Sequence, residues 1–308
     1  MKNTVKLMSF NVLNGWKPGC PVYRTMQTRS ERAARLIIEE LPDILCLQEY
    51  DYYYRHDGKF AEVVNGEYAE ADTSDETPAK SWNPILYRPS KLSVIESGGF
   101  DFVANGFVPV STGNADRETY PPRACNTSNY QYPENSDEGR AGYAISKFRS
   151  LSYAVMQDKD GSRFTVANTH YSLRSWCQAD EVEFVIGKLD EIRQRHNCPI
   201  LITGDFNSAT HWGAAKLMLE KGFLDTYDMA VVKDDCASCH PSSGKGTDDE
   251  TDVMPSGNYK THAIDHIYAD RVLTVNSYRI IVQEELLSVS DHCPTVIKFK
   301  NENGGSKL

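Results

Sequence analysis

Short runs of apolar residues that end in a polar or charged residue recur along this chain. The clearest lies at 199–208, where the apolar residues 200–202 are typical of a buried strand. Gly204 is expected to break that strand, and Asp205 and Asn207 follow at once. Because side chains alternate in extended backbone, both should point to the same side of the strand end. There they can hold a water, a metal ion or a phosphate oxygen, whereas an ordinary Asx turn is the plainer interpretation.

The same periodicity predicts an alternation of strands and helices. Strands are expected at 5–10, 44–47, 84–88, 92–95, 140–148, 163–169, 200–202, 263–268, 273–282 and 295–299, and helices at 31–41, 178–196 and 212–221. Ser30 is expected to cap the first helix. We expect strands 84–88 and 92–95 to form a hairpin, and strands 140–148 and 163–169 to form another that turns at Asp160-Gly161.

Two stretches of the sequence resemble each other. Residues 42–49 and 198–205 both begin where a helix ends, continue as an apolar strand and finish on an acid, Glu49 or Asp205. This pattern predicts two similar α/β halves packed on each other.

Composition and charge limit the class of protein. Of the 308 residues, 40% are apolar and 25% are charged, as in an ordinary globular protein, and no run of 18 apolar residues predicts a membrane span. The first strand begins at Val5 and leaves no room for a signal peptide, so we expect a cytoplasmic protein, or a secreted one if a leader was removed. The net charge of −10, without any Lys/Arg run, does not favour a protein that grips long nucleic acids.

Two local features allow alternatives. Cys236-Ala-Ser-Cys239-His240 has the spacing of a c-type haem attachment site, but it could also be a zinc site or a plain loop. Arg24, Arg29 and Arg32 are expected to form a solvated helix face, and the alternative is that they reach the mouth of a site near Asn11.

Eight polar side chains stand where predicted strands end. They are Asn11, Glu49, His170, Asp205, Asn207, Asp265, Asp291 and His292. Oxygen and imidazole ligands without thiols suit a hard divalent cation, Mg²⁺ or Mn²⁺, better than a structural zinc. Clustered carboxylates repel one another and cost stability, so structural need alone does not explain this set.

The motifs around these residues resemble those of the endonuclease/exonuclease/phosphatase superfamily. The similar segments are Ser-Phe-Asn11, Leu-Gln-Glu49, Asn-Thr-His170, Gly-Asp205-Phe-Asn207, Ile-Asp265-His and Ser-Asp291-His292-Cys-Pro, and the whole match spans residues 5–299. The resemblance implies an α/β four-layer sandwich: two mixed β-sheets face to face, helices outside, and a site where strand ends from both sheets meet. We therefore expect one catalytic domain over residues 1–300, with a frayed tail at 301–308.

The resemblance also implies roles for these residues. Glu49 would be the principal metal ligand, with Asn11 beside it and Asp291 sharing the ion. Asp205 and Asn207 would position and deprotonate the attacking water. His292, oriented by Asp265 through a hydrogen bond of about 2.6–3.2 Å, and His170 would contact the phosphate oxygens, as would Arg140. In-line attack on a phosphate ester needs a base near the water and a cation at the equatorial oxygens.

The chain departs from the family pattern at two positions. Leu13 stands where many members carry an acid, and Ser81 stands where many carry a glutamate that orients the first histidine. The role of His170 as a proton donor is therefore in doubt.

The expected function is a Mg²⁺- or Mn²⁺-dependent phosphoesterase acting as a monomer. We expect a compact phosphodiester or phosphomonoester, a small molecule or a lipid headgroup, beneath loops 98–139 and 233–260. Aromatic walls (Tyr120, Tyr130, Tyr132 and Tyr143) suit a pocket better than a duplex on a flat face. A DNA or RNA nuclease is the alternative, and a non-catalytic binding module is a more remote one.

Overall fold

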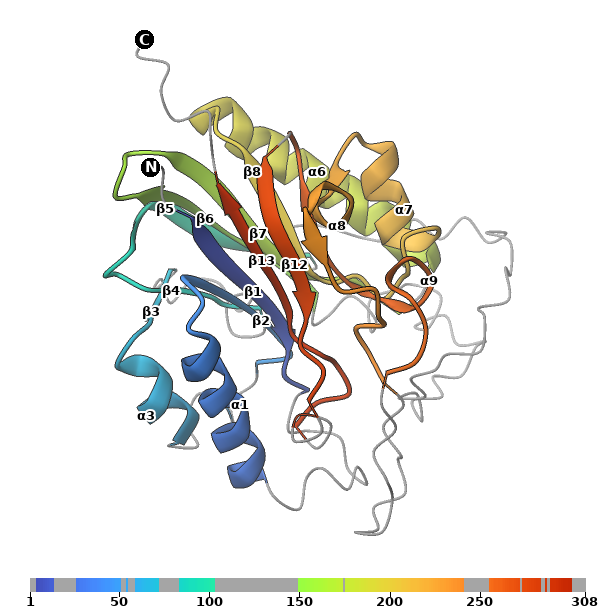
Figure 1. Ribbon diagram of the computed structural model, residues 1–308. Helices are drawn as coiled ribbons and strands as arrows, with labels where there is room; N and C mark the ends of the chain where they lie inside the picture. The colour runs from blue at the N-terminus through green and yellow to red at the C-terminus, as the bar shows by residue number, and fades with distance from the viewer. Residues whose placement is uncertain are drawn as a thin grey trace.

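Two mixed β-sheets packed face to face form the centre of the molecule (Figure 1). The computed structural model describes residues 4–13, 26–50, 54, 59–71, 83–102, 149–173, 175–240, 255–271, 273–283, 286 and 289–300. Helices cover the outer face of each sheet, so the predicted α/β four-layer sandwich is confirmed. None of the helices in these ranges is long and apolar enough to cross a membrane.

The first sheet has seven strands in the order β10-β12-β13-β1-β2-β4-β3. Their bounds are β1 (Val5–Asn11), β2 (Ile44–Gln48), β3 (Ala69–Glu70), β4 (Ile85–Tyr87), β10 (Val232–Lys233), β12 (Thr274–Ile280) and β13 (Thr295–Lys300). Strands β1 and β2 are parallel and are joined through helix α1 (Met26–Glu40). Their carboxyl ends therefore lie at the same edge of the sheet.

The second sheet has six strands in the order β5-β6-β7-β8-β11-β9. Their bounds are β5 (Leu92–Asp101), β6 (Ser150–Asp158), β7 (Arg163–His170), β8 (Ile200–Asp205), β9 (Leu224–Asp225) and β11 (Asp265–Ala269). Strands β7 and β8 are parallel and are joined through the long helix α6 (Ser175–His196).

The two sheets repeat one pattern of pairing. In the first, β1 pairs antiparallel with β13 on one side and parallel with β2 on the other, and β2 then pairs antiparallel with β4. In the second, β7 pairs antiparallel with β6 and parallel with β8, and β8 pairs antiparallel with β11. The resemblance between 42–49 and 198–205 therefore reflects two halves of similar topology, with β2 and β8 in equivalent places.

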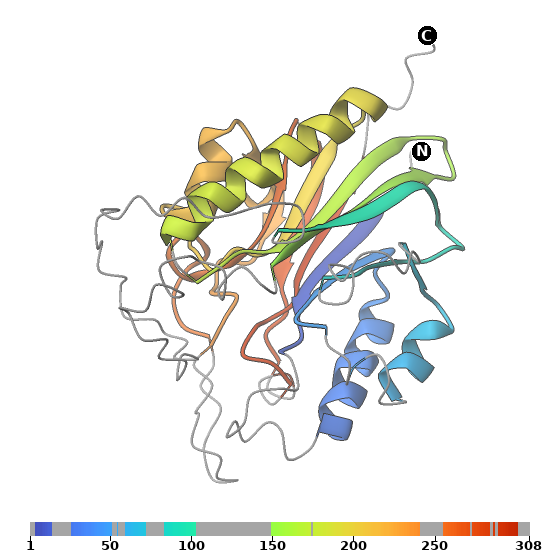
Figure 2. The same cartoon turned by 180° about the vertical axis from the view of Figure 1, so that it is seen from behind.

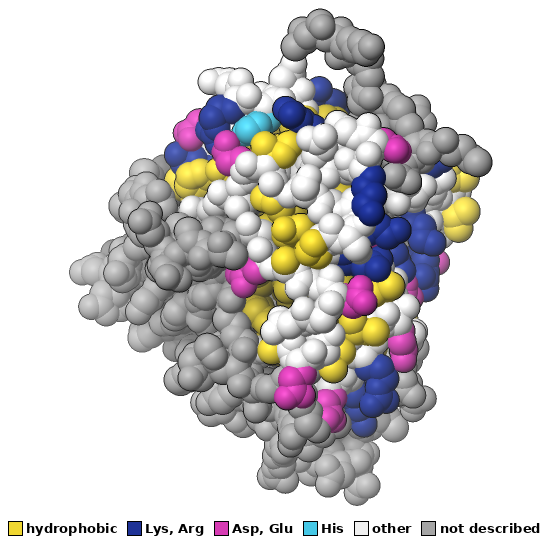
Figure 3. Space-filling model, turned by 90° about the vertical axis from the view of Figure 1, so that its left-hand side faces the viewer, with side chains coloured by type: hydrophobic (Ala, Val, Ile, Leu, Met, Phe, Trp, Pro, Cys, Tyr) yellow, Lys and Arg dark blue, Asp and Glu magenta, His cyan; other side chains and the backbone are white. Residues whose placement is uncertain are grey.

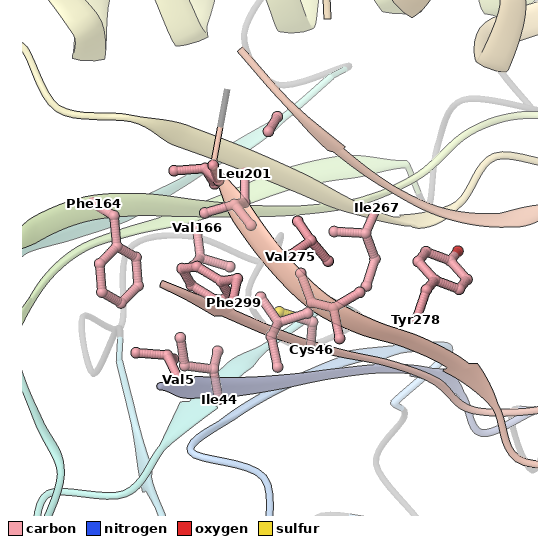
Figure 4. Packing of buried hydrophobic residues seen from close by; sticks show 14 of the residues in the cluster. Val5, Ile44, Cys46, Phe164, Val166, Leu201, Ile267, Val275, Tyr278 and Phe299 are labelled. Atoms are coloured by element: carbon pink, nitrogen blue, oxygen red, sulfur yellow. The ribbon is translucent and has the colours of Figure 1, made fainter. Parts of the chain in front are cut away.

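Three apolar clusters hold the layers together. The first fills the space between the sheets and includes Ile44, Val166, Leu201 and Phe299 (Figure 4). The second lies between the seven-stranded sheet and helices α1 and α3 (Lys59–Asn65). The third lies between the six-stranded sheet and helices α6 and α7 (Gly213–Glu220) on the opposite side of the molecule (Figure 2). The short helices α8 (Thr226–Met229) and α9 (Tyr259–His262) complete the described set.

Helix α1 begins earlier than predicted. It starts at Met26, so Ser30 lies inside the helix and is not its cap. The predicted solvated face is also wrong for Arg29, which is 1% exposed and donates hydrogen bonds to the carbonyls of Val289 (2.8 Å) and Leu13 (2.7 Å). Arg29 therefore ties together the chain segments that follow β1 and precede β13, while Arg32 is exposed.

Both predicted hairpins differ from the observed pairing. Strand β4 belongs to the seven-stranded sheet and β5 to the six-stranded sheet, so the turn at Arg88-Pro89-Ser90 is a crossover between sheets and not a hairpin. The turn at Asp160-Gly161 does form a hairpin, but its first strand is β6, whereas residues 140–148 lie outside the described residues.

Gly204 lies within β8 and does not end it. Its φ is +145°, and a Cβ added there would lie 1.8 Å from the carbonyl oxygen of Thr169 on β7. Only glycine allows β8 to approach β7 this closely while carrying Asp205 at its end.

We expect Gly204→Ala to lower the free energy of unfolding by at least about 3 kcal/mol, because the backbone of β7 would have to move. Urea denaturation would measure this loss. Gly187→Ala is the control, since Gly187 lies in helix α6 and no atom is within 4 Å of its added Cβ. The free energy of unfolding of that variant should rise by about 0.5–1 kcal/mol. Equal stability of the two variants would contradict the requirement for glycine at position 204.

Candidate active site

The predicted residues converge where strand ends from both sheets meet. On the six-stranded sheet, His170, Asp205 and Asp265 stand in one row across β7, β8 and β11. On the seven-stranded sheet, Asn11 ends β1 and Glu49 directly follows β2. Glu49 is half-buried, and the other seven predicted side chains are buried.

The carboxylate of Asp205 lies at the centre of this cluster. Its Oδ2 accepts a hydrogen bond from Asn11 Nδ2 at 3.0 Å and lies 3.1 Å from Nε2 of His170 and 3.6 Å from Nε2 of His292. Its other oxygen accepts from the backbone N–H of Asn207 at 2.8 Å, the Asx turn expected after this strand. One carboxylate oxygen therefore faces an amide and two imidazoles supplied by both sheets.

Asn207 links the two loops that follow β7 and β8. Its Nδ2 donates to the carbonyl of Tyr171 at 2.9 Å and lies 3.0 Å from Nε2 of His170. Gln178, a fully buried residue of α6 that the sequence analysis did not select, supports the same loops. Its Nε2 donates to the carbonyls of Ser172 (2.6 Å) and Phe206 (3.2 Å).

His292 and Asp265 form the pair that was predicted. Nδ1 of His292 lies 2.9 Å from Oδ2 of Asp265, within the expected range, which confirms this contact between the two sheets. The hydroxyl of Ser238 donates to the same oxygen at 2.6 Å and accepts from the backbone N–H of Asp265 at 3.0 Å. Sequence patterns gave no sign of Ser238, because its partner lies 27 residues away.

The two histidines differ in charge. Burial and the positive charge of Arg149 hold the pKa of His170 below its usual value, so its imidazole is neutral at pH 7. Burial also opposes the charged form of His292, but the carboxylates of Asp265 and Asp205 outweigh it and raise its pKa well above the usual value. Burial favours the neutral form of Asp205 too, yet the hydrogen bonds from His170 and the Asn207 N–H, together with the charge of His292, lower its pKa and keep it ionised.

Strained backbone marks the strand ends that form the site. Glu49, Asn207 and Leu13 have positive φ values of 56°, 48° and 56°. Such conformations cost free energy and persist where the surrounding fold imposes them, often at functional sites. Leu13, which replaces the acid of many family members, is buried and donates its N–H to Asn11 Oδ1 at 3.0 Å.

The donor set fits a hard divalent cation. Oδ1 of Asp291 is buried and has no hydrogen-bond partner in the described part of the chain. Glu49 and Asn11 stand nearby in the fold, with Asn11 Nδ2 at 3.4 Å from Glu49 Oε1. A second arrangement, Asp205, Asp265 and His292, has its ligand atoms within 4.8 Å of one another, although these groups already satisfy one another through hydrogen bonds. A buried carboxylate oxygen without a hydrogen-bond partner favours the first arrangement, at Asp291, Glu49 and Asn11, as the cation site.

Comparison with known proteins identifies the family. A model of the endonuclease/exonuclease/phosphatase family matches residues 8–292, which is nearly the whole chain. The chain belongs to the endonuclease/exonuclease/phosphatase family. A search of curated proteins finds no match.

Solved structures of family proteins share the fold. An endonuclease/exonuclease/phosphatase protein from Bacteroides vulgatus is 20% identical, with a TM-score of 0.67 and coverage of 98% of this chain and 100% of that one. A mannosyl-6-phosphatase from Bacteroides thetaiotaomicron is 18% identical, with a TM-score of 0.65 and coverage of 96% and 99%. TDP2 from D. rerio, solved with a single-strand DNA product, is 14% identical, with a TM-score of 0.60 and coverage of 97% and 100%. At these identities the likeness establishes the fold.

An arginine that the sequence analysis overlooked lies beside the family site. Arg149 directly precedes β6, and its charge acts on His170. Its Nε is buried and has no hydrogen-bond partner within the described ranges. Arg140, which the family resemblance implies as a phosphate contact, lies outside the described residues.

Several other predicted features also fall outside those residues. They are Ser81, Arg24, the greater part of loop 98–139, the middle of loop 233–260, and the tyrosines Tyr120, Tyr130, Tyr132 and Tyr143.

The segment 236–240 packs against the chain next to the site, and no metal-binding group that contains its cysteines occurs among the described residues. Cys239 forms an isolated antiparallel bridge with His292, and His240 Nε2 lies 2.7 Å from the carbonyl of Ser290. The Sγ of Cys239 lies 3.7 Å from the carbonyl of His262. The segment therefore pairs with the chain that carries Asp291 and His292.

The raised pKa of His292 gives a prediction for stability against pH. A group whose pKa is raised by folding stabilises the protein fully below its unfolded value, about 6.5, and this contribution is lost as pH rises through the folded value. Asp265→Asn should therefore destabilise the protein most below pH 6.5 and progressively less above it, as measured by urea denaturation in EDTA across pH 5–9. His211→Gln, at an exposed position, is the control and should show no such trend. If Asp265→Asn lowers the free energy of unfolding by the same amount at every pH, Asp265 does not raise the pKa of His292.

Proposed function

We propose that this protein is a divalent-cation-dependent phosphoesterase that hydrolyses a compact phosphodiester or phosphomonoester through in-line attack of water. The observation that carries the proposal is the buried Asp205 carboxylate, whose Oδ2 lies 3.0 Å from the Asn11 amide and 3.1 and 3.6 Å from the imidazoles of His170 and His292. Such a cluster offers a base for water and cationic or polar donors for phosphate in one place.

The charge of each side chain determines its role in the reaction. Asp205, which Asn11 and Asn207 hold in place, accepts a hydrogen bond from the attacking water and takes its proton as the new P–O bond forms. The P–O bond on the opposite side of phosphorus breaks, and the leaving oxygen takes up a proton from solvent as the alcohol departs. Protonated His292 donates to a phosphate oxygen and stabilises the charge that develops there. Neutral His170 and the Arg149 guanidinium, whose Nε lacks a partner in the described part of the chain, bind the remaining oxygens.

Glu49, Asp291 and Asn11 would hold the cation. The bound ion would supply positive charge that neutralises the phosphate oxygens. Asp291 Oδ1, which has no hydrogen-bond partner among the described residues, and the oxygen-rich donor set support Mg²⁺ or Mn²⁺ over softer metals.

A compact substrate agrees with the charge of the protein. The net charge is −10, and on the face drawn in Figure 3 basic side chains lie at the upper left, at the top and near the right-hand edge, with acidic ones among them and without a basic stripe across the coloured surface. A protein that neutralises many phosphates of a long polyanion needs such a stripe.

The deciding experiment compares substrates under identical Mg²⁺ and salt. We expect turnover of small phosphate esters, such as sugar phosphates and bis-p-nitrophenyl phosphate, and little nicking of plasmid DNA. Efficient nicking without turnover of small esters would establish a nuclease, and no turnover of any ester with Mg²⁺ or Mn²⁺ would favour a binding module.

A further inference from the structure

The side chains between the two sheets change from apolar to polar toward the site. Leu7 and Val166 belong to the apolar cluster shared by the sheets. Two residues further along the same strands, and so on the same face, come Ser9 and Asn168. Both are buried, as is Gln48 at the end of β2. A fully buried layer of uncharged polar groups therefore lies directly beneath the charged residues of the site.

Within this layer an amide pair joins the two sheets. Nε2 of Gln48, on β2 of the seven-stranded sheet, donates to Oδ1 of Asn168, on β7 of the six-stranded sheet, at 2.7 Å. The same Nε2 also donates to Ser9 Oγ at 3.1 Å. Both amides are 0% exposed, so water does not compete for these bonds.

Asn168 is held by the opposite sheet at every polar atom of its side chain. Besides accepting from Gln48, it donates through Nδ2 to the carbonyls of Leu47 at 2.8 Å and Pro84 at 3.0 Å. Leu47 lies on β2 and Pro84 immediately precedes β4, so all three partners belong to the seven-stranded side. The bonds therefore fix both the distance and the lateral position of β7 relative to β2.

This pair lies one or two residues from site residues on both strands. Gln48 is followed directly by Glu49, whose backbone is strained, and Asn168 precedes His170 by two residues. Two other polar contacts between the sheets at this end, Asn11 with Asp205 and Asp265 with His292, involve site residues themselves. The amide pair is thus separate from the atoms that would touch substrate.

We infer that Gln48 and Asn168 are positioning residues that set the spacing between the two halves of the site. Aliphatic packing between sheets is non-directional and allows small slips, whereas paired amides fix direction and length. Loss of the pair would let Glu49 and His170 shift relative to each other. A misplacement of about 1 Å at a reacting centre can cost about a hundredfold in rate. The inference rests on the proposed function, because its main readout is turnover.

The test is a double-mutant cycle with side chains of similar size that lack the amide, Gln48→Met and Asn168→Leu. Each single variant should lower kcat for a small phosphate ester at least about tenfold and change KM less than about threefold. The double variant should fall no further than the worse single variant, because both changes remove one shared link.

Tyr68→Phe is the matched control for loss of a buried hydrogen bond. The Tyr68 hydroxyl donates to the carbonyl of Pro42 at 2.8 Å, near the opposite end of β2 from the site. This variant should lower the melting temperature without changing kcat. If Asn168→Leu does not fold, the kcat of Gln48→Met can still be compared with that of Tyr68→Phe, provided that the two variants have similar melting temperatures. A lower kcat for Gln48→Met would then support the positioning role.

The outcomes distinguish a failure of the positioning role from a failure of the proposed function. Wild-type protein that hydrolyses no phosphate ester would refute the proposed function. The positioning role alone would be overturned if the wild-type protein is active and each single variant keeps the wild-type kcat. It would also be overturned if the fold decrease in kcat of the double variant equals the product of the decreases of the two single variants.

Discussion

Replacing Asp205 with asparagine is expected to lower kcat about a thousandfold or more. The carboxylate is the ionised group at the centre of the cluster, and the amide would keep its size but not its basicity. The N–H of Asn207 could still donate to the remaining oxygen, so the turn should survive. Steady-state kinetics on a small phosphate ester, with circular dichroism to verify folding, would measure the effect.

Asp225→Asn is the control for this substitution. Asp225 is a buried carboxylate of the same sheet, and it accepts from the backbone N–H of Tyr227 at the start of α8, outside the site. This substitution should lower the free energy of unfolding but leave kcat within about threefold of the wild-type value. An Asp205→Asn protein that keeps more than a tenth of wild-type kcat would remove Asp205 from the role of base.

Chelation with EDTA is expected to abolish turnover, and Mg²⁺ or Mn²⁺ should restore it. The basis is the set of oxygen donors at Glu49, Asp291 and Asn11, among which Asp291 Oδ1 has no hydrogen-bond partner in the described residues. Glu49→Gln should keep the fold but lower turnover by several orders of magnitude, roughly the loss expected when a metal site can no longer stabilise phosphate charge. A titration of activity against Mg²⁺ concentration would show whether the variant needs more metal.

Glu96→Gln provides the control for the loss of a glutamate. Glu96 lies on β5, where it pairs with Arg195 at 2.7 Å, and it is not part of the site. That variant should retain the activity and the Mg²⁺ dependence of the wild type. Full activity of the wild-type protein in excess EDTA would rule out the cation requirement.

The sequence by itself determined which residues stand at the ends of strands. Short apolar runs place Asn11 and Asp205 at the carboxyl ends of β1 and β8, and the structure has them there, whereas Asp265, expected inside a strand at 263–268, is the first residue of β11. Helix α6 also follows from its apolar stripe, with Val185 and Leu189 fully buried. These features depend on local geometry, which a strand or helix imposes on its own side chains.

Pairing between strands could not be determined in this way. The turn after β4 looks like a hairpin in sequence, yet β4 and β5 enter different sheets because each finds its partner elsewhere in the chain. The first strand of the β6–β7 hairpin was placed about ten residues too early for the same reason, and Arg149 was missed with it.

Only the tertiary structure decided how the two halves of the site meet. The bonds from Gln48 to Asn168, from Asn11 to Asp205 and from Ser238 to Asp265 join residues 120, 194 and 27 positions apart. A hydrogen bond between distant segments leaves no periodic trace, because each partner is an ordinary polar residue within its own stretch of chain. The charges of His170 and His292 likewise follow from burial and from the groups that the packed sheets bring against them.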